Sequence, residues 1–228
     1  YKRPVNTCPR CRQTYADGVR FCPADGSLLA AVVDPYLGKV LGGQFQLVAV
    51  AGRGAMGTVY RAEQARMHRT VAVKVLRPEL TAGVGPERFL REIEVSANLQ
   101  HPHILPLFDS GSADGFLYYV MPFIDGETLR TRLDREHQLG IDEAVRIARE
   151  VADALDYAHR HGVIHRDIKP ENILLQGGHA QVADFGIALA ASRSEGGARM
   201  TETGMSLGTP HYMAPEQAMG EREISPKA

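Results

Sequence analysis

The segment His165-Arg166-Asp167-Ile168-Lys169-Pro170-Glu171-Asn172 packs five ionisable side chains and an amide into eight positions. Apolar residues flank it, Val163-Ile164 on one side and Ile173-Leu174-Leu175 on the other. Charged groups between apolar strands are costly to bury unless they pair or act on a ligand. A second such group, Asp184-Phe185-Gly186, also follows an apolar run. The pattern indicates a site of chemistry built on loops between short strands.

Apolar spacing predicts the elements around this segment. Residues 142–161 form a helix whose apolar positions recur every three or four residues, and we expect that stripe to be core. Its members are Ala144, Val145, Ala148, Val151, Ala152, Leu155 and Ala158. A helix is predicted over 86–99, and strands over 45–50, 58–62, 70–75, 117–121, 123–124, 172–175 and 180–182. Residues 192–228 are expected to form a long loop with one short helix.

The stretch from Gly52 to Val59 fits the pattern G-x-G-x-x-G-x-V. Glycines allow close approach to phosphate, but they also make turns, so the pattern alone admits a phosphate-binding loop or a structural hairpin. β-prone residues follow Gly57 where a dinucleotide-binding fold would begin a helix, so we expect a hairpin lid. Lys74 ends an apolar strand, where an unpaired ammonium is costly. Glu92 on the next helix is one candidate partner; the alternative is a strand-end lysine that reaches solvent.

Composition narrows the class of protein. Of 228 residues, 26 are Lys or Arg and 27 are Asp or Glu, which gives no bulk electrostatic reason to expect nucleic acid or an anionic membrane as partner. No apolar run approaches the ~18 residues of a membrane span, and no signal peptide is evident. All three cysteines lie within the first 22 residues, which favours a reducing, cytoplasmic setting. The chain opens at Tyr1, so we expect a piece of a longer protein, and a membrane anchor beyond residue 228 stays open.

The N-terminal cysteines suggest a metal site. Cys8-Pro-Arg-Cys11 and Cys22-Pro-Ala-Asp25 look like two knuckles of a zinc ribbon, with Asp25 where a cysteine is usual. A carboxylate can ligate zinc, so Zn²⁺ bound by three cysteines and Asp25 is one interpretation. An outside fourth ligand and a metal-free ribbon are the others. Residues 1–30 are turn-rich and have little else to stabilise them, which supports zinc and a recognition or regulatory role.

Taken in order, the motifs resemble those of the eukaryotic-type (Hanks-type) Ser/Thr protein kinases of bacteria. They are the glycine-rich loop, the VAVK lysine, the helix glutamate, HRD…N, DFG, and Ala214-Pro215-Glu216, over roughly residues 44–220. The resemblance implies an α+β, protein-kinase-like bilobal fold: a β-rich N-lobe at about 44–124 and an incomplete helical C-lobe at about 125–228. A zinc-ribbon-like module at 1–30 and a linker at 31–43 would precede it.

The resemblance implies ATP and Mg²⁺ as cofactors and a protein with Ser or Thr as substrate. Lys74 would hold the α- and β-phosphates with Glu92 as its ion-pair partner, and Asn172 and Asp184 would coordinate Mg²⁺ through hard oxygen ligands. Asp167 would orient the attacking hydroxyl and accept its proton. Lys169 would neutralise charge on the transferring phosphoryl group. The implied ATP-binding residues are Gly52, Gly54, Gly57, Val59, Ala72, Lys74, Met121 as gatekeeper, and Pro122 and Ile124, whose backbones would meet adenine.

Arg166, beside the catalytic aspartate, implies control by phosphorylation, because an arginine there can pair with a phosphate in the loop that follows Asp184. Thr201, Thr203 and Ser206 are the candidate sites, Thr201 and Thr203 foremost, and a kinase homodimer would serve trans-autophosphorylation. Lys169, two residues after Asp167, and Thr209, before Ala214-Pro215-Glu216, resemble the pattern of Ser/Thr rather than Tyr kinases.

Other classes of function stay open on the sequence alone. The family's helical lobe extends past the Ala214-Pro215-Glu216 motif, so one alternative is a nucleotide-binding or regulatory fragment without catalysis. In a second alternative, the zinc-ribbon-like module carries the function and acts as an adaptor that binds a protein or a nucleic acid.

Overall fold

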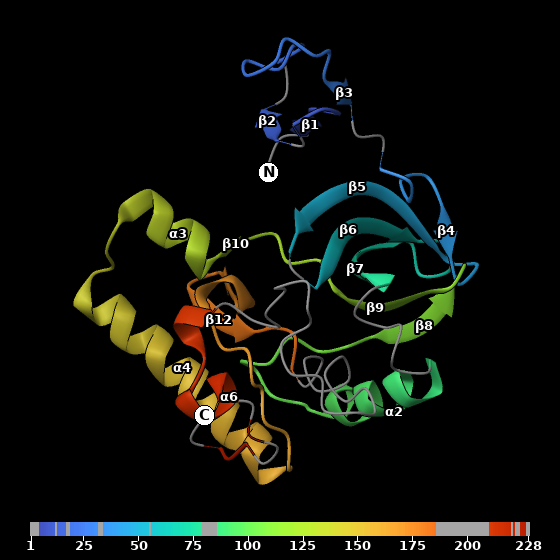
Figure 1. The fold of residues 1–228 in the computed structure, drawn as a ribbon. Helices are drawn as coiled ribbons and strands as arrows, with labels where there is room; N and C mark the ends of the chain where they lie inside the picture. The colour runs from blue at the N-terminus through green and yellow to red at the C-terminus, as the bar shows by residue number, and fades with distance from the viewer. Residues whose placement is uncertain are drawn as a thin grey trace.

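A computed structural model describes residues 5–11, 13–16, 19–31, 34–54, 56–78, 86–185, 210–219, 221 and 224–226. Its larger part contains a β-rich half and a helical half joined after residue 122 (Figure 1). Among these residues no helix is long and apolar enough to cross a bilayer. The expected α+β fold with two lobes is confirmed.

The β-rich half is a six-stranded antiparallel sheet in the order β4-β5-β6-β7-β9-β8. Its strands are β4 (Val40–Leu41), β5 (Phe45–Arg53), β6 (Gly57–Gln64), β7 (Arg69–Leu76), β8 (Asp109–Ala113) and β9 (Phe116–Pro122). Helix α2 (Pro86–Ala97) packs Phe89 and Ile93 into an apolar cluster with Tyr119 of β9. A second cluster, with Phe45 and Tyr60 at its centre, fills the other face of the sheet. The sheet is therefore buried on both faces, which fixes its register.

The described helical half is built around helices α3 and α4 and one three-stranded sheet. Its elements are β10 (Glu127–Thr128), α3 (Leu129–Glu136), α4 (Ile141–Arg160), η1 (Pro170–Asn172), β11 (Ile173–Gln176), β12 (His179–Val182), η2 (Pro210–Tyr212) and α6 (Pro215–Ala218). The strands β10, β11 and β12 form one sheet. One face of α4 packs on that sheet through Ile147, which belongs to one apolar cluster with Ile173 and Ala180.

The predicted core stripe of α4 is wrong in part. The buried positions are Ile147, Ala154 and Ala158, and the exposed ones include Ala144, Val145, Ala148 and Ala152. The helix carries two adjacent apolar stripes, and the β10-β11-β12 sheet covers only one of them. Periodicity identified the helix but could not tell which stripe is covered, because that depends on the neighbours.

Three further differences from the sequence-based expectations concern individual strands and one helix. Residues 123–124 are not a strand, because β9 ends at Pro122. Strand β4 lies inside the predicted linker of 31–43 and pairs with β5. Strand β8 and helix α3 were not predicted: β8 is polar (DSGSA) and lacks alternation, so only its pairing with β9 makes it a strand.

The N-terminal residues form a separate small sheet, which lies apart from the other two sheets in Figure 1. Its strands are β1 (Val5–Thr7), β2 (Thr14–Ala16) and β3 (Ala30–Ala31), in the order β2-β1-β3. Among the side chains of this module that the structure describes, Cys8, Cys22 and Leu29 are buried. So small a cluster gives the described part of the module little stabilisation from burial alone.

Candidate active site

The glycine-rich stretch is the turn of the β5–β6 hairpin, as expected. Gly54 N–H donates to the Gly57 carbonyl at 2.8 Å and closes the turn. A Cβ on Gly57 would lie 2.2 Å from the carbonyl oxygen of Val75 on β7, so only glycine fits where these strands meet. The stretch is therefore a strand-to-strand turn, and not the strand-to-helix turn of dinucleotide-binding folds.

Lys74 does not reach solvent; it is buried on β7 and pairs with Asp184. Its Nζ lies 2.5 Å from Oδ2 of Asp184, a residue 110 positions further along the chain. Glu92, the partner expected from the sequence, lies on α2, and its side chain is outside the described part of the structure. The Lys74–Glu92 pair therefore stays a prediction, while the Lys74–Asp184 pair is observed.

Asp184 is held by its backbone and by two donors. Its φ is +66°, in the left-handed region that residues with a side chain seldom occupy, so its surroundings must hold it there. Besides Lys74, the hydroxyl of Tyr119 on β9 donates to Oδ1 at 2.6 Å. Burial works to raise the pKa of Asp184, but the charge and hydrogen bond of Lys74 outweigh it, so the pKa falls below its ordinary value. The carboxylate is therefore ionised at neutral pH.

Asp167, Lys169 and Asn172 form a second polar cluster in the loop around η1. Lys169 Nζ donates to both carboxylate oxygens of Asp167, at 2.7 and 2.9 Å. Asn172 Nδ2 donates to the carbonyl of Asp167 at 2.8 Å and to Oδ2 at 3.1 Å. Because Asn172 donates through its amide nitrogen, its Oδ1 remains as an acceptor for a hard cation.

Backbone contacts join the two clusters. Ala183 N–H donates to the Asn172 carbonyl at 2.9 Å, which places Asp184 beside the Asp167 loop. His165, buried below both, has Nε2 2.8 Å from the Ala183 carbonyl, and its Nδ1 accepts from Asp167 N–H at 3.2 Å. These partners require the neutral ring with the proton on Nε2, and burial lowers the pKa of His165 accordingly. The sequence places these residues in two separate motifs, and the structure brings the two motifs into one site.

Four of the residues predicted to bind ATP, Val59, Ala72, Met121 and Ile124, lie in or against one apolar cluster beside Lys74. Ala72 and Met121 are paired across β7 and β9, and both are buried. Val59, Ile124 and Leu174 pack against the same cluster and are half-buried. Leu174 on β11 was not singled out from the sequence, where it looks like any other apolar strand residue.

The last described helix contacts the loop that holds Asp167 through Gln217. Its Nε2 donates to the carbonyl of Arg166 at 2.7 Å, and its Oε1 accepts from Ala214 N–H at 3.1 Å. Arg130 of α3 also donates to the hydroxyl of Tyr212, which holds this segment on the helical half. Thr201, Thr203, Ser206 and Thr209 lie outside the described residues.

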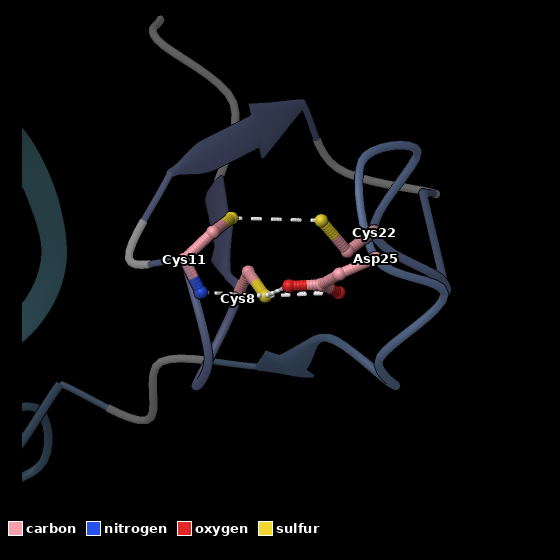
Figure 2. Close-up of side chains that lie close together, drawn as sticks. All are labelled: Cys8, Cys11, Cys22 and Asp25. Carbon is pink, nitrogen blue, oxygen red and sulfur yellow. Dashed lines mark hydrogen bonds between the residues drawn. The ribbon is translucent and has the colours of Figure 1, made fainter.

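The predicted zinc ligands converge (Figure 2). The Sγ atoms of Cys8, Cys11 and Cys22 and a carboxylate oxygen of Asp25 all lie within 4.8 Å of one another. Cys11 Sγ is 3.6 Å from Cys22 Sγ, and Cys8 Sγ is 3.3 Å from Asp25 Oδ2. Zinc bonded tetrahedrally at about 2.3 Å to each sulfur would separate two sulfurs by about 3.8 Å. The four groups therefore fit a tetrahedral metal site.

Burial and hydrogen bonds shift the pKa values of three groups in this cluster. Burial raises the pKa of the Cys8 thiol, which donates to Asp25. A backbone hydrogen bond with Gln13 lowers the pKa of Cys11, and hydrogen bonds from Ser27 lower that of Asp25. Backbone N–H groups of residues 10 and 11 point at Cys8 Sγ at 3.4 Å, which stabilises a thiolate.

Comparisons with known proteins agree with this geometry. The protein kinase domain family matches residues 45–228. Serine/threonine-protein kinase PknD of Mycobacterium tuberculosis is 44% identical over 189 residues, which cover 82% of this chain and 28% of PknD. PrkC of Bacillus subtilis, also named a serine/threonine-protein kinase, is 38% identical over 186 residues, 81% of this chain and 28% of PrkC. The chain thus spans little more than a quarter of these relatives.

Among solved structures, a point mutant of the kinase domain of Mycobacterium tuberculosis PknI superposes with a TM-score of 0.67 at 35% identity. The match covers 84% of this chain and 70% of that domain. This chain belongs to the protein kinase family. The resemblance drawn from its motifs is therefore confirmed, as is the β-rich lobe followed by a partial helical lobe.

Proposed function

We propose that this chain carries the catalytic centre of a Ser/Thr protein kinase, which transfers the γ-phosphoryl group of ATP to a protein hydroxyl. The observation that carries the proposal is the adjacency of the Lys74–Asp184 pair and the Asp167–Lys169–Asn172 cluster. The first group pairs the Lys74 ammonium with the Asp184 carboxylate beside the glycine-rich turn. The other holds a second carboxylate with a lysine. Phosphoryl transfer needs both groups, because its catalysis depends on positioning the two reactants and on stabilising the charge of the transferring phosphoryl group.

In the proposed reaction the substrate hydroxyl oxygen bonds to the γ-phosphorus while the bond from that phosphorus to the β–γ bridging oxygen breaks. The hydroxyl proton goes to Asp167, and ADP leaves with the bonding electrons. Lys169, already within 2.9 Å of both Asp167 oxygens, holds that carboxylate and offers positive charge to the phosphoryl group. Lys74 would exchange Asp184 for the α- and β-phosphates.

Asn172 and Asp184 would hold Mg²⁺, since an amide oxygen and an ionised carboxylate are ligands that Mg²⁺ accepts. When bound, Mg²⁺ neutralises phosphate charge. The buried pair Ala72 and Met121, with Val59, Ile124 and Leu174, supplies an apolar surface suited to adenine.

The test is transfer of radiolabelled phosphate from ATP to a generic basic protein, with Lys74→Met and Asp167→Asn as matched variants. We expect label on Ser or Thr, reduced at least about 100-fold in Asp167→Asn, because that variant lacks the general base. A chain that binds ATP but transfers no phosphate, under conditions where a longer version does, would instead support a nucleotide-binding or regulatory fragment.

Control by autophosphorylation is part of the proposal. The family resemblance and the position of Arg166 support it, and Thr201 and Thr203 are the proposed sites, with two copies of the chain as enzyme and substrate. Incubation with MgATP followed by mass spectrometry should find phosphate there. Unmodified Thr201 and Thr203 in an active sample would remove this part.

The three free thiols support a reducing, cytoplasmic setting.

A second proposal concerns the N-terminal module: Cys8, Cys11, Cys22 and Asp25 bind one structural Zn²⁺. The convergence of four ligand atoms and the small core of the module support it. Elemental analysis of the full chain should give one zinc per chain. The Cys11→Ser variant should lose it, and Asp25→Cys should retain it. Absence of stoichiometric zinc from zinc-supplemented protein would reject the site.

A further inference from the structure

Tyr119 lies in the candidate active site but belongs to no recognised motif. It is fully buried on β9, directly opposite Lys74 in the register of β7 and β9. Its hydroxyl donates to Oδ1 of Asp184 at 2.6 Å, while Lys74 donates to Oδ2. Side chains from two adjacent strands therefore hold both oxygens of one carboxylate.

The orientation of that carboxylate needs such support. The last torsion of an aspartate side chain is broad, so the backbone alone does not fix which oxygen faces the site. Tyr119 can fix it, because its ring is packed among Phe89, Leu117 and Met121 in the core between the sheet and α2. A hydroxyl on a rigid, buried ring is a stationary donor.

Lys74 and Tyr119 differ in what nucleotide binding does to them. The Lys74 ammonium is attracted to phosphates, so its hydrogen bond to Oδ2 is exchangeable. The Tyr119 hydroxyl carries no charge and belongs to a ring buried in the apolar core. Nucleotide phosphates therefore do not draw it away from Oδ1 of Asp184.

We propose that Tyr119 is a positioning residue, whose hydroxyl holds Oδ1 of Asp184 so that Oδ2 is presented to Mg²⁺ when nucleotide binds. This inference rests on the proposed role of Asp184 as a Mg²⁺ ligand. Hydrogen-bond partners of metal-ligating groups commonly set metal affinity by about 10–100-fold. Tyr119 therefore sets the Mg²⁺ requirement of the site rather than taking part in the chemistry.

The variant Tyr119→Phe keeps the ring and removes only the hydroxyl. Tyr118→Phe is the matched control: Tyr118 is the neighbouring residue of β9, but it belongs to the cluster on the other face of the sheet, near Gly42 and Gly111. For the full chain and both variants, the affinity of a fluorescent ATP analogue is measured with and without Mg²⁺, and Mn²⁺ binding is followed by electron paramagnetic resonance.

We expect Tyr119→Phe to raise the Mg²⁺ concentration for half-maximal nucleotide binding about 10-fold, with a parallel loss of Mn²⁺ affinity. Its Mg²⁺-free nucleotide affinity should be unchanged, and excess Mg²⁺ should restore phosphoryl transfer. Tyr118→Phe should behave as the unmodified chain does. If Tyr119→Phe and the unmodified chain show the same Mg²⁺ dependence, the inference is overturned. It is also overturned if Tyr119→Phe loses nucleotide affinity equally with and without Mg²⁺, because such a loss signals general damage to the site.

The variant Asp184→Asn distinguishes the role of Tyr119 from the proposed role of Asp184 as a Mg²⁺ ligand. If that variant keeps normal Mg²⁺ dependence, Asp184 is not a ligand and both ideas fail. If it loses Mg²⁺ dependence while Tyr119→Phe keeps it, only the role of Tyr119 is removed.

Discussion

The carboxylate of Asp34 lies 2.7 Å from the guanidinium of Arg53, and this ion pair joins the segment that follows the N-terminal module to the glycine-rich turn. Asp34 is 4% exposed and also accepts from the hydroxyl of Tyr60 at 2.8 Å and from the N–H of Tyr36 at 3.1 Å. The segment before β4 therefore packs on the sheet, where Asp34 contacts side chains of β5 and β6.

Asp34→Ala should destabilise the chain, because it leaves the buried Tyr60 hydroxyl without its acceptor. An unsatisfied buried polar group costs about 1–3 kcal/mol, and we expect a loss of that size in the free energy of unfolding by denaturant. The control is Asp114→Asn, which removes the charge of an exposed ion pair with Lys39 at 3.4 Å that should be worth at most about 1 kcal/mol and keeps a residue type that tolerates the positive φ of position 114. Equal losses in the two variants would contradict this account.

Gly57→Ala should be harmful and Gly52→Ala should not. A Cβ at Gly57 would meet the Val75 carbonyl at 2.2 Å, whereas a Cβ at Gly52 has no heavy atom within 4 Å. Forcing β6 and β7 apart should cost about 1–3 kcal/mol, as overpacking generally does. Thermal unfolding without nucleotide measures both variants. Indistinguishable midpoints would show that the hairpin yields more easily than its geometry implies.

Glu127→Gln should lower stability at neutral pH and progressively less as the pH falls into the acid range. Hydrogen bonds from Arg135 and Arg132 lower the pKa of Glu127 to about 2 from 4.5. A depressed folded-state pKa gives stability that is present above the unfolded-state value and is lost as the pH falls from about 4.5 to about 2. Because the network is partly exposed, we expect about 1 kcal/mol or less at pH 7. Unfolding curves at pH 7 and pH 3 test this. A difference between variant and unmodified chain that persists undiminished at pH 3 would count against it.

His165 should make stability fall as the pH drops below 7. Burial lowers its pKa in the folded chain, so the unfolded chain binds the proton more readily below about pH 6.5. The free energy of unfolding should therefore decline between pH 7 and pH 5, and His165→Gln should flatten that decline. His68→Asn, at an exposed turn, is the control and should keep the original slope. An unchanged slope in His165→Gln would show that other groups cause the decline.

Local sequence was enough to predict most elements and the chemical inventory of the site. The strands over 45–50, 58–62 and 70–75 and the helices over 86–99 and 142–161 appear close to their expected bounds, because apolar periodicity reports directly on strand and helix. Asp167, Lys169 and Asn172 lie within six residues, so their cluster needs little more than one loop conformation.

Only the tertiary structure decided which distant groups meet. The partner of Lys74 lies 110 residues away, and Tyr119 contacts the same carboxylate although its position in an apolar strand predicts only core. Likewise, the covered stripe of α4 depends on where β11 and β12 lie. Periodicity is a property of one element, whereas pairing and burial are properties of two elements packed together. A sequence therefore shows which side chains are available, and packing selects the ones that touch.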